Sequence, residues 1–229
     1  MVGIGGIGMS ALVPMLLEQG HTVSGSDPVA SPVTERLQAL GIPVGSHHAA
    51  ENVQGADLVV ASSAIPKTNP ELTAAKDRQI PIWPRAQMLG ALLEQKRAIV
   101  VTGAHGKTTL SAMITKVLVD CGLDPSAFIG GDIPSLGGNT RLGRGEWAVA
   151  EGDESDGSFI YLTPEIAIIN NIDADHLDYY TDIDAIVHQF TQFAEGVKPG
   201  GWILHSADCE DCAQAIRGID RNTRSYGFP

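Results

Sequence analysis

The feature that most constrains this chain is the short segment 103–109, which reads Gly-Ala-His-Gly-Lys-Thr-Thr. An apolar run from Ala98 to Val101 precedes the segment, and a helical pattern of apolar residues follows from Leu110. A strand, a glycine-rich turn and a helix in this order surround an anion with backbone N–H groups and the positive end of the helix. Lys107 adds a positive charge beside them. The segment therefore predicts a phosphate-binding loop, and the alternative is an ordinary glycine turn that opens a helix.

The loop is shorter than a standard Walker A motif, because the first glycine of G-x-x-x-x-G-K-[ST] would fall on Val101. The motif that is present reads G-x-x-G-K-T. The hydroxyl of Thr108 takes the position from which loops of this kind bind magnesium. The residues expected to surround the phosphates are Gly103, Ala104, His105, Gly106, Lys107, Thr108 and Thr109.

Two further apolar strands end in polar clusters after this loop. Trp147 to Ala150 leads directly into Glu151, and Glu165 to Asn170 leads into a segment that contains His176. Because these strand ends converge with the loop, Glu151 takes the place of a Walker B-type acid that holds magnesium. We interpret His176 as a metal or phosphate ligand, and the alternative is a buried histidine that is satisfied by hydrogen bonds.

The chain opens on a second glycine motif, Gly3-Ile4-Gly5-Gly6-Ile7-Gly8, which matches G-x-G-x-x-G. Asp27 follows Gly8 by 19 residues, where a dinucleotide-binding fold offers an acid to a ribose hydroxyl. Only two residues precede the motif, so we expect a chain trimmed at its N-terminus. A glycine turn for tight packing is one alternative. A nicotinamide dehydrogenase is disfavoured, because it would leave the second phosphate loop unexplained.

Strand and helix patterns alternate along the chain and predict two α/β domains. Residues 1–95 predict a Rossmann-like domain with a parallel sheet, and residues 96–229 predict an incomplete P-loop-type α/β domain that binds ATP. The second domain contains a glycine-rich loop from Gly137 to Arg141. The length of 229 residues and the 26 glycines fit this organisation.

The charge of the chain argues against one class of partner. Fifteen basic residues against 27 acidic ones leave a net charge of −12, which opposes binding to nucleic acid. No apolar run is long enough to insert into a membrane, and no signal peptide precedes the first motif. Three cysteines fit a reducing cytoplasm. We expect a cytoplasmic protein whose partners are small molecules, and the sequence does not indicate its oligomeric state.

In combination the motifs resemble the Mur ligases of peptidoglycan synthesis. The second half contributes T-G-A-H-G-K-T-T, A-E-G-D-E-S-D-G-S-F and N-I-D-A-D-H-L-D, and the first half contributes G-I-G-G-I-G-M-S, V-S-G-S-D, S-S-A-I-P and P-R-A-Q-M-L. The resemblance covers nearly all of the chain, and within the family it is strongest to the branch that adds alanine. The branch that attaches a recycled tripeptide to the same sugar nucleotide ranks second, because its acidic motif typically reads D-E-Y-D.

The resemblance implies a ligase that uses ATP and Mg²⁺ to join L-alanine to the carboxylate of UDP-N-acetylmuramate through an acyl phosphate. Lys107 would neutralise charge on the transferred phosphoryl group. Thr108 and Glu151 would hold one magnesium ion, and His176 would bind a second. The residues implied to contact the sugar nucleotide are Gly3, Gly5, Gly8, Asp27, His48, Arg85 and Arg141.

Two departures from the family pattern bear on activity. The third domain of the family, which brings the amino acid, is absent, and the later motif that contacts adenine has no counterpart before Pro229. We therefore expect an inactive fragment of a ligase. An alternative of a different class is a nucleotide-binding module without catalysis. Such a module would need the phosphate loop but would not need Glu151 and His176.

Overall fold

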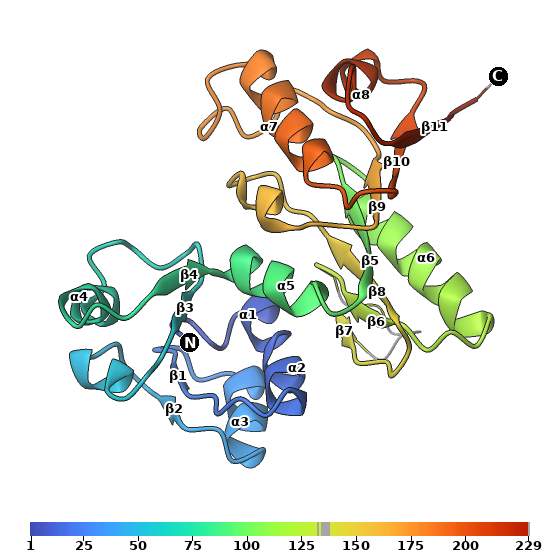
Figure 1. Ribbon diagram of the computed structural model, residues 1–229. Helices are drawn as coiled ribbons and strands as arrows, with labels where there is room; N and C mark the ends of the chain where they lie inside the picture. Colours follow the sequence, from blue (N-terminus) through green and yellow to red (C-terminus); the bar gives the residue numbers. More distant parts are fainter. Residues whose placement is uncertain (132, 134–137, 229) are drawn as a thin grey trace. The chain divides into compact units, whose positions relative to one another are not determined.

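The structure, a computed structural model, describes residues 1–131, 133 and 138–228, and it divides into two units, Met1–Leu89 and Gly90–Pro229 (Figure 1). Each unit combines helices with parallel strands, which confirms the predicted α/β fold class. Across residues 1–131 and 138–228, no helix has both the length and the apolar character needed to cross a bilayer.

The first unit is built from short parallel strand pairs with helices between them. Its elements are α1 (Ile7–Ser10), α2 (Val13–Glu18), β1 (Gly25–Ser26), α3 (Pro32–Ala39), β2 (Val44–Gly45), the 3-10 helix η1 (Ala50–Val53), β3 (Val59–Ala61), α4 (Pro70–Asp77), β4 (Ile82–Pro84) and the start of α5 (Arg85–Leu93). Strand β1 pairs with β2 and β3 pairs with β4, both in parallel. Val2 bridges Ser26 and Ala61, so the residues before the first glycine motif lie between the two pairs.

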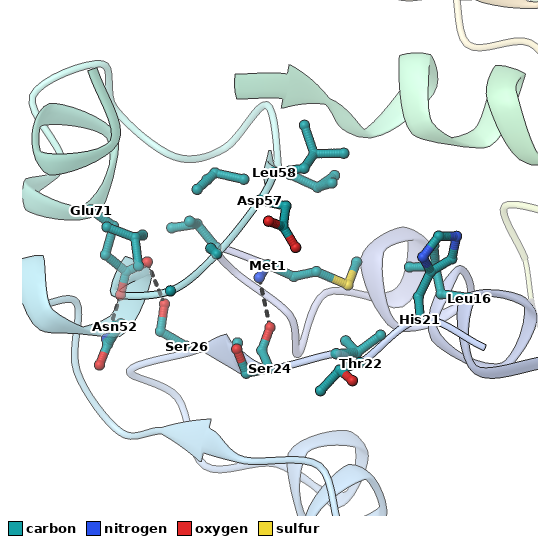
Figure 2. Close-up of a pocket in the computed structure, with 18 of the residues that line it drawn as sticks. Met1, Leu16, His21, Thr22, Ser24, Ser26, Asn52, Asp57, Leu58 and Glu71 are labelled. Atoms are coloured by element: carbon teal, nitrogen blue, oxygen red, sulfur yellow. Dashed lines mark hydrogen bonds between the residues drawn. The ribbon is translucent and has the colours of Figure 1, made fainter. Parts of the chain in front are cut away.

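Local sequence explains how the helices of this unit begin. The helical pattern after the first glycine motif is interrupted, because Pro14 cannot continue a helix and instead occupies the first turn of α2. Helix α3 begins with a capping box, in which the Thr34 amide donates to the Ser31 hydroxyl and the Ser31 amide donates to the Thr34 hydroxyl. A cavity of about 650 Å³ opens beside Met1 and the edges of β1 and β3 (Figure 2).

The second unit contains one sheet with the strand order β11-β10-β9-β5-β8-β6-β7 among the described residues. Its elements are β5 (Arg97–Thr102), α6 (Lys107–Asp120), β6 (Ser126–Phe128), β7 (Thr140–Arg141), β8 (Trp147–Glu151), the 3-10 helix η3 (Ser158–Tyr161), β9 (Ile166–Ile169), α7 (Ile183–Glu195), β10 (Trp202–Ser206), α8 (Glu210–Ala215) and β11 (Asn222–Tyr226). The strand pairs are parallel except that β7 runs antiparallel to β6.

Both faces of β5 are covered by other parts of the unit, which explains why successive residues of this strand are all apolar. Side chains alternate between the two faces of a strand. Ile99 and Val101 pack with α6 through residues such as Ile114. Val100 faces the other side, where Gly152 lies between it and Phe159. A strand buried on both faces reads as a continuous apolar run, which is what the sequence shows here.

The sequence predicted a glycine-rich loop over residues 137–141, but the last two of these residues form a strand in the structure. Gly137 lies outside the described residues. Thr140 and Arg141 form the short strand β7, because they pair with Phe128 and Ala127 of β6.

The aromatic cluster under α7 generates a stability prediction. Phe193 is fully buried, and its ring centroid lies 5.3 Å from that of Phe159. We expect Phe193→Ala to lower the free energy of unfolding by about 3–5 kcal/mol, because it removes a buried ring and leaves a cavity. Phe228, which is 92% exposed, provides the matched control. Urea unfolding of both variants measures the difference, and equal small losses would contradict this packing.

Candidate nucleotide-binding site

The phosphate loop connects the end of β5 to the start of α6. Gly106 caps the helix with φ 82°, a left-handed conformation that glycine adopts without steric cost. The Leu110 amide donates to the Gly106 carbonyl, which is the first bond of the helix. The amides of Lys107, Thr108 and Thr109 come earlier and have no intrahelical acceptor. These amides and the positive helix end form the kind of site that accepts phosphate.

Lys107 makes a charged pair within this loop. Its Nζ donates to the Gly103 carbonyl at 2.7 Å and to the two carboxylate oxygens of Glu154 at 2.8 and 2.9 Å. The Glu154 side chain is only 4% exposed. The sequence prediction did not single out Glu154, although its place three residues after Glu151 in an acidic run was a usable signal. A phosphate that binds Lys107 must therefore compete with Glu154.

Glu151 and Thr108 meet at the neighbouring strand end. Glu151 lies opposite Val101 in the β5–β8 ladder, and its Oε2 accepts a hydrogen bond from Thr108 Oγ1 at 3.3 Å. Oε1 is buried and has no hydrogen-bond partner among the described residues. Burial raises the pKa of Glu151, while hydrogen bonds from Gly130 and Thr108 and the charge of Lys107 act in the opposite direction.

The donor set of this pair fits Mg²⁺. Magnesium prefers carboxylate, hydroxyl and water oxygens, and Glu151 with Thr108 offers the first two. A cation beside Oε1 would supply the partner that this buried atom lacks and would favour the ionised carboxylate. When bound there, magnesium would neutralise charge on phosphate oxygens.

His176 lies on the loop after β9 and faces a different acid. Its Nε2 is 3.7 Å from Glu154 Oε1 and 3.9 Å from Asp175 Oδ2. Its φ of 56° belongs to the left-handed region, which is uncommon for residues other than glycine. Within the described parts of the chain, no three or more His, Cys, Asp or Glu side chains gather as a metal site. The structure thus groups His176 with Glu154 and Lys107, and its role as a ligand of a second magnesium stays a prediction.

Two asparagines after β9 fix the first half of the phosphate loop. The His105 amide donates to Asn171 Oδ1 at 2.8 Å, and the Ala104 amide donates to the Asn171 carbonyl at 3.3 Å. The His105 carbonyl accepts from the side-chain amides of Asn170 and Asn171. The amides of Ala104 and His105 therefore hold the loop, and those from Lys107 to Thr109 remain for phosphate. Sequence reasoning missed both asparagines, although Asn170 ends a predicted strand and Asn171 directly follows it.

The first unit brings together most of its predicted contact residues. The Gly5 amide donates to Asp27 Oδ2 at 2.9 Å, and a Cβ on Gly5 would stand 2.8 Å from that oxygen. The Arg85 side chain lies against Gly8. Asp27 also accepts from the Val29 amide through Oδ1, so its carboxylate ties the glycine loop to the end of β1.

The two remaining predicted contact residues have partners of their own. His48 Nδ1 lies 2.9 Å from Ser26 Oγ at the end of β1. Arg141 donates to the Pro125 carbonyl and to Asp124 Oδ1, both at 2.6 Å. These acceptors precede β6, whereas the phosphate loop lies at the carboxyl ends of the strands. The structure does not bring Arg141 to the phosphate loop, and its contact with a substrate stays a prediction.

The strand, loop and helix over 97–120, set in a parallel sheet, define a P-loop-type α/β protein that carries a Rossmann-like unit before it. Family models refine this class. "Mur ligase family, catalytic domain" matches residues 1–97, and "Mur ligase middle domain" matches residues 101–229. The chain belongs to the Mur ligase family, as its motifs predicted.

Similar proteins agree with this assignment. UDP-N-acetylmuramate–L-alanine ligases from Desulfatibacillum aliphaticivorans and Syntrophus aciditrophicus are 46% and 48% identical to the chain over 227 residues. The match covers 99% of this chain but 50% and 47% of those proteins, so the chain spans about half the length of the curated relatives it matches.

Solved structures of Mur ligases are also similar to this chain. A UDP-N-acetylmuramate-alanine ligase from Thermotoga maritima has a TM-score of 0.83 at 33% identity, and the match covers 99% of this chain and 51% of that one. A UDP-N-acetylmuramate:L-alanyl-gamma-D-glutamyl-meso-diaminopimelate ligase from Neisseria meningitides has a TM-score of 0.89 at 28% identity, with 98% and 76% coverage.

The geometry around Lys107 and Glu151 predicts two separable effects on ATP binding. We expect Glu151→Gln to weaken binding about tenfold or more with Mg²⁺ present and little without it, because this carboxylate would contact ATP only through the cation. Changing Lys107 should weaken binding under both conditions. Removing the lysine alone would leave Glu154 buried without its cation, so the double variant Lys107→Gln/Glu154→Gln keeps a neutral hydrogen-bonded pair.

Lys116 provides the matched control for these variants. It lies on the same helix, is exposed, and pairs with Asp120 one turn further on. Lys116→Gln should leave ATP binding unchanged in isothermal titration calorimetry. A loss in Glu151→Gln that does not depend on magnesium would remove Glu151 from the cation site.

Proposed function

We propose that this chain supplies the sugar-nucleotide-binding and ATP-binding parts of a ligase that joins L-alanine to the carboxylate of UDP-N-acetylmuramate. The observation that carries the proposal is the phosphate loop at the start of α6 beside the oxygen pair of Thr108 and Glu151. A module that only bound nucleotide would need the loop but not a partly buried carboxylate whose Oε1 has no hydrogen-bond partner among the described residues. The identity of 46–48% to named alanine ligases supports the choice of amino acid.

The proposed reaction has two steps. A carboxylate oxygen of the sugar nucleotide attacks the γ-phosphorus of ATP, and the bond to the β–γ bridging oxygen breaks, which gives an acyl phosphate and ADP. The amine of alanine then attacks the acyl carbon, loses a proton and displaces inorganic phosphate. Most of the catalysis in phosphoryl transfer comes from positioning and charge neutralisation.

The residues of this chain have defined parts in the first step. The amides of Lys107 to Thr109 bind phosphate oxygens, and the Lys107 side chain turns from Glu154 to the transferred group. Thr108 and Glu151 would hold a cation, which would neutralise charge on the phosphate oxygens when bound. His176, whose Nε2 lies 3.7 Å from Glu154 Oε1, would bind a second magnesium ion.

The first unit is proposed to bind the sugar nucleotide. The Arg85 side chain beside Gly8 offers a guanidinium group, which suits a diphosphate, and Asp27 holds the glycine motif in place through the Gly5 amide. We assign residues 1–95 to this substrate and residues 96–229 to ATP, and we expect the protein to act in the cytoplasm.

A second candidate is the ligase that attaches a tripeptide to the same sugar nucleotide. It is favoured by the TM-score of 0.89 to the Neisseria meningitides structure, of which the match covers 76%. The sequence identity of 28% to that protein is well below the 46–48% to alanine ligases, so we rank it second. In both candidate reactions, the residues proposed to bind ATP and the sugar nucleotide have the same roles.

The division of labour between the units predicts selective loss of one substrate. Arg85→Ala should weaken the binding of UDP-N-acetylmuramate about tenfold or more, because it removes a charged hydrogen-bond donor. It should leave the affinity for ATP within about twofold. Arg36→Ala on the exposed surface of α3 serves as the control. Calorimetric titration with UDP-N-acetylmuramate, ATP and NADH measures all three affinities. Equal loss of both substrates, or tight NADH binding, would contradict the assignment.

The chain on its own is expected to release no phosphate in response to L-alanine. Proximity of the reactants supplies much of the rate in such reactions, and residues 1–229 span about half the length of the alanine ligases they match. A coupled phosphate assay with ATP, UDP-N-acetylmuramate and L-alanine checks this. Formation of UDP-N-acetylmuramoyl-alanine by the pure chain would show that the expectation of inactivity is wrong.

A further inference from the structure

A buried carboxylate in the first unit has no part in the proposed reaction. Glu71 lies in the first turn of α4 and is 1% exposed. Figure 2 shows it beside Ser26 and Asn52, which come from β1 and η1. Its Oε2 accepts from Ser26 Oγ at 2.7 Å, and its Oε1 accepts from the Asn52 side chain and from the Ala49 amide. One carboxylate therefore joins three separate segments of the unit.

The same hydroxyl also contacts a histidine. Ser26 Oγ lies 2.9 Å from Nδ1 of His48, and that nitrogen is 3.7 Å from Glu71 Oε1. Serine, histidine and an acid are the residue types of a nucleophilic triad. Ser26 is 1% exposed and its hydroxyl bonds to the acid, so it cannot reach a substrate as a nucleophile.

Counting protons assigns the direction of each hydrogen bond. Both oxygens of Glu71 face hydrogen-bond donors, the Ala49 amide and the Asn52 side-chain amide on Oε1 and the Ser26 hydroxyl on Oε2, and a carboxylate can only accept. The single hydroxyl proton of Ser26 is therefore directed to Glu71. Its contact with His48 then requires that Nδ1 is the donor, and a neutral imidazole with a proton on Nδ1 has a bare Nε2.

We propose that Glu71 is a positioning residue that acts through Ser26 to hold the proton of His48 on Nδ1. The ring then offers Nε2 as a hydrogen-bond acceptor to a donor group of the sugar nucleotide, such as a hydroxyl or an imide N–H. The His48 side chain is 18% exposed, so part of the ring remains accessible while Nδ1 is engaged. This ligand assignment rests on the proposed function, whereas the proton assignment does not.

The test is the tautomer of His48 in protein labelled with ¹⁵N-histidine. At about pH 9, where histidines as a class are neutral, long-range ¹H–¹⁵N spectra distinguish the two forms, and His48→Gln identifies the signal among the seven histidines. We expect the Nδ1–H form in the unmodified chain. In Glu71→Gln the new amide can donate to Ser26, whose proton then turns to Nδ1, so His48 should change to the Nε2–H form.

Two more variants separate this role from a purely structural one. Ser26→Ala removes the acceptor of the Nδ1 proton and should also lose the Nδ1–H preference, whereas Glu35→Gln on the surface of α3 should leave the tautomer unchanged. An Nε2–H form in the unmodified chain, or an unchanged tautomer in folded Glu71→Gln, would overturn the proposal.

Substrate binding tests the ligand part separately. Glu71→Gln should weaken the binding of UDP-N-acetylmuramate about tenfold, because one hydrogen bond is lost, and should leave the affinity for ATP unchanged. If the tautomer changes as expected but UDP-N-acetylmuramate does not bind even the unmodified chain, the proton assignment stands and the proposed function fails. If the sugar nucleotide binds and Glu71→Gln changes neither affinity nor tautomer, the positioning role fails and the proposed function stands.

Discussion

The burial of β5 on both faces and both edges is the constraint on which the second unit depends. A strand in this position must satisfy its backbone hydrogen bonds with two neighbours, and β8 and β9 provide them. The registers set Val101 opposite Glu151 and Thr102 opposite Ile169. An acid therefore stands on one side of the phosphate loop, and the asparagines after β9 stand on the other. The chemistry of the site follows from the order of the strands.

Charge balance inside this site depends on Glu154. Its pairing with Lys107 takes place at low exposure, where an unpaired charge would cost several kcal/mol. A phosphate that draws Lys107 away would leave this carboxylate without its cation, and His176 is the basic side chain 3.7 Å from it. Binding of phosphate to Lys107 is therefore coupled to the environment of the Glu154 carboxylate.

Sequence predicted the elements but not the long-range pairs. The apolar run before Gly103 and the one before Glu151 gave β5 and β8 almost to the residue, because a strand buried on both faces has a strong local signal. The bond from Lys107 to Glu154 spans 47 residues and that from Ser26 to Glu71 spans 45. No local pattern encodes such partners. Arg141 was interpreted as a substrate contact, whereas the structure places it in β7 and its side chain donates to Asp124 and to the Pro125 carbonyl.

Glu71 and Glu151 each accept a hydrogen bond from a hydroxyl, but they differ in whether their other oxygen has a hydrogen-bond partner. Both oxygens of Glu71 are satisfied from within the first unit, so this carboxylate needs nothing from outside and can act only on its neighbours. Glu151 receives the Thr108 hydroxyl on Oε2, but its buried Oε1 lacks a partner in the described structure. A buried acceptor left unsatisfied costs about 1–3 kcal/mol. Binding a cation would recover that cost at Glu151 and could recover nothing at Glu71. Hydrogen-bond satisfaction therefore distinguishes Glu151, which we propose binds an external ion, from Glu71, which we propose positions a side chain.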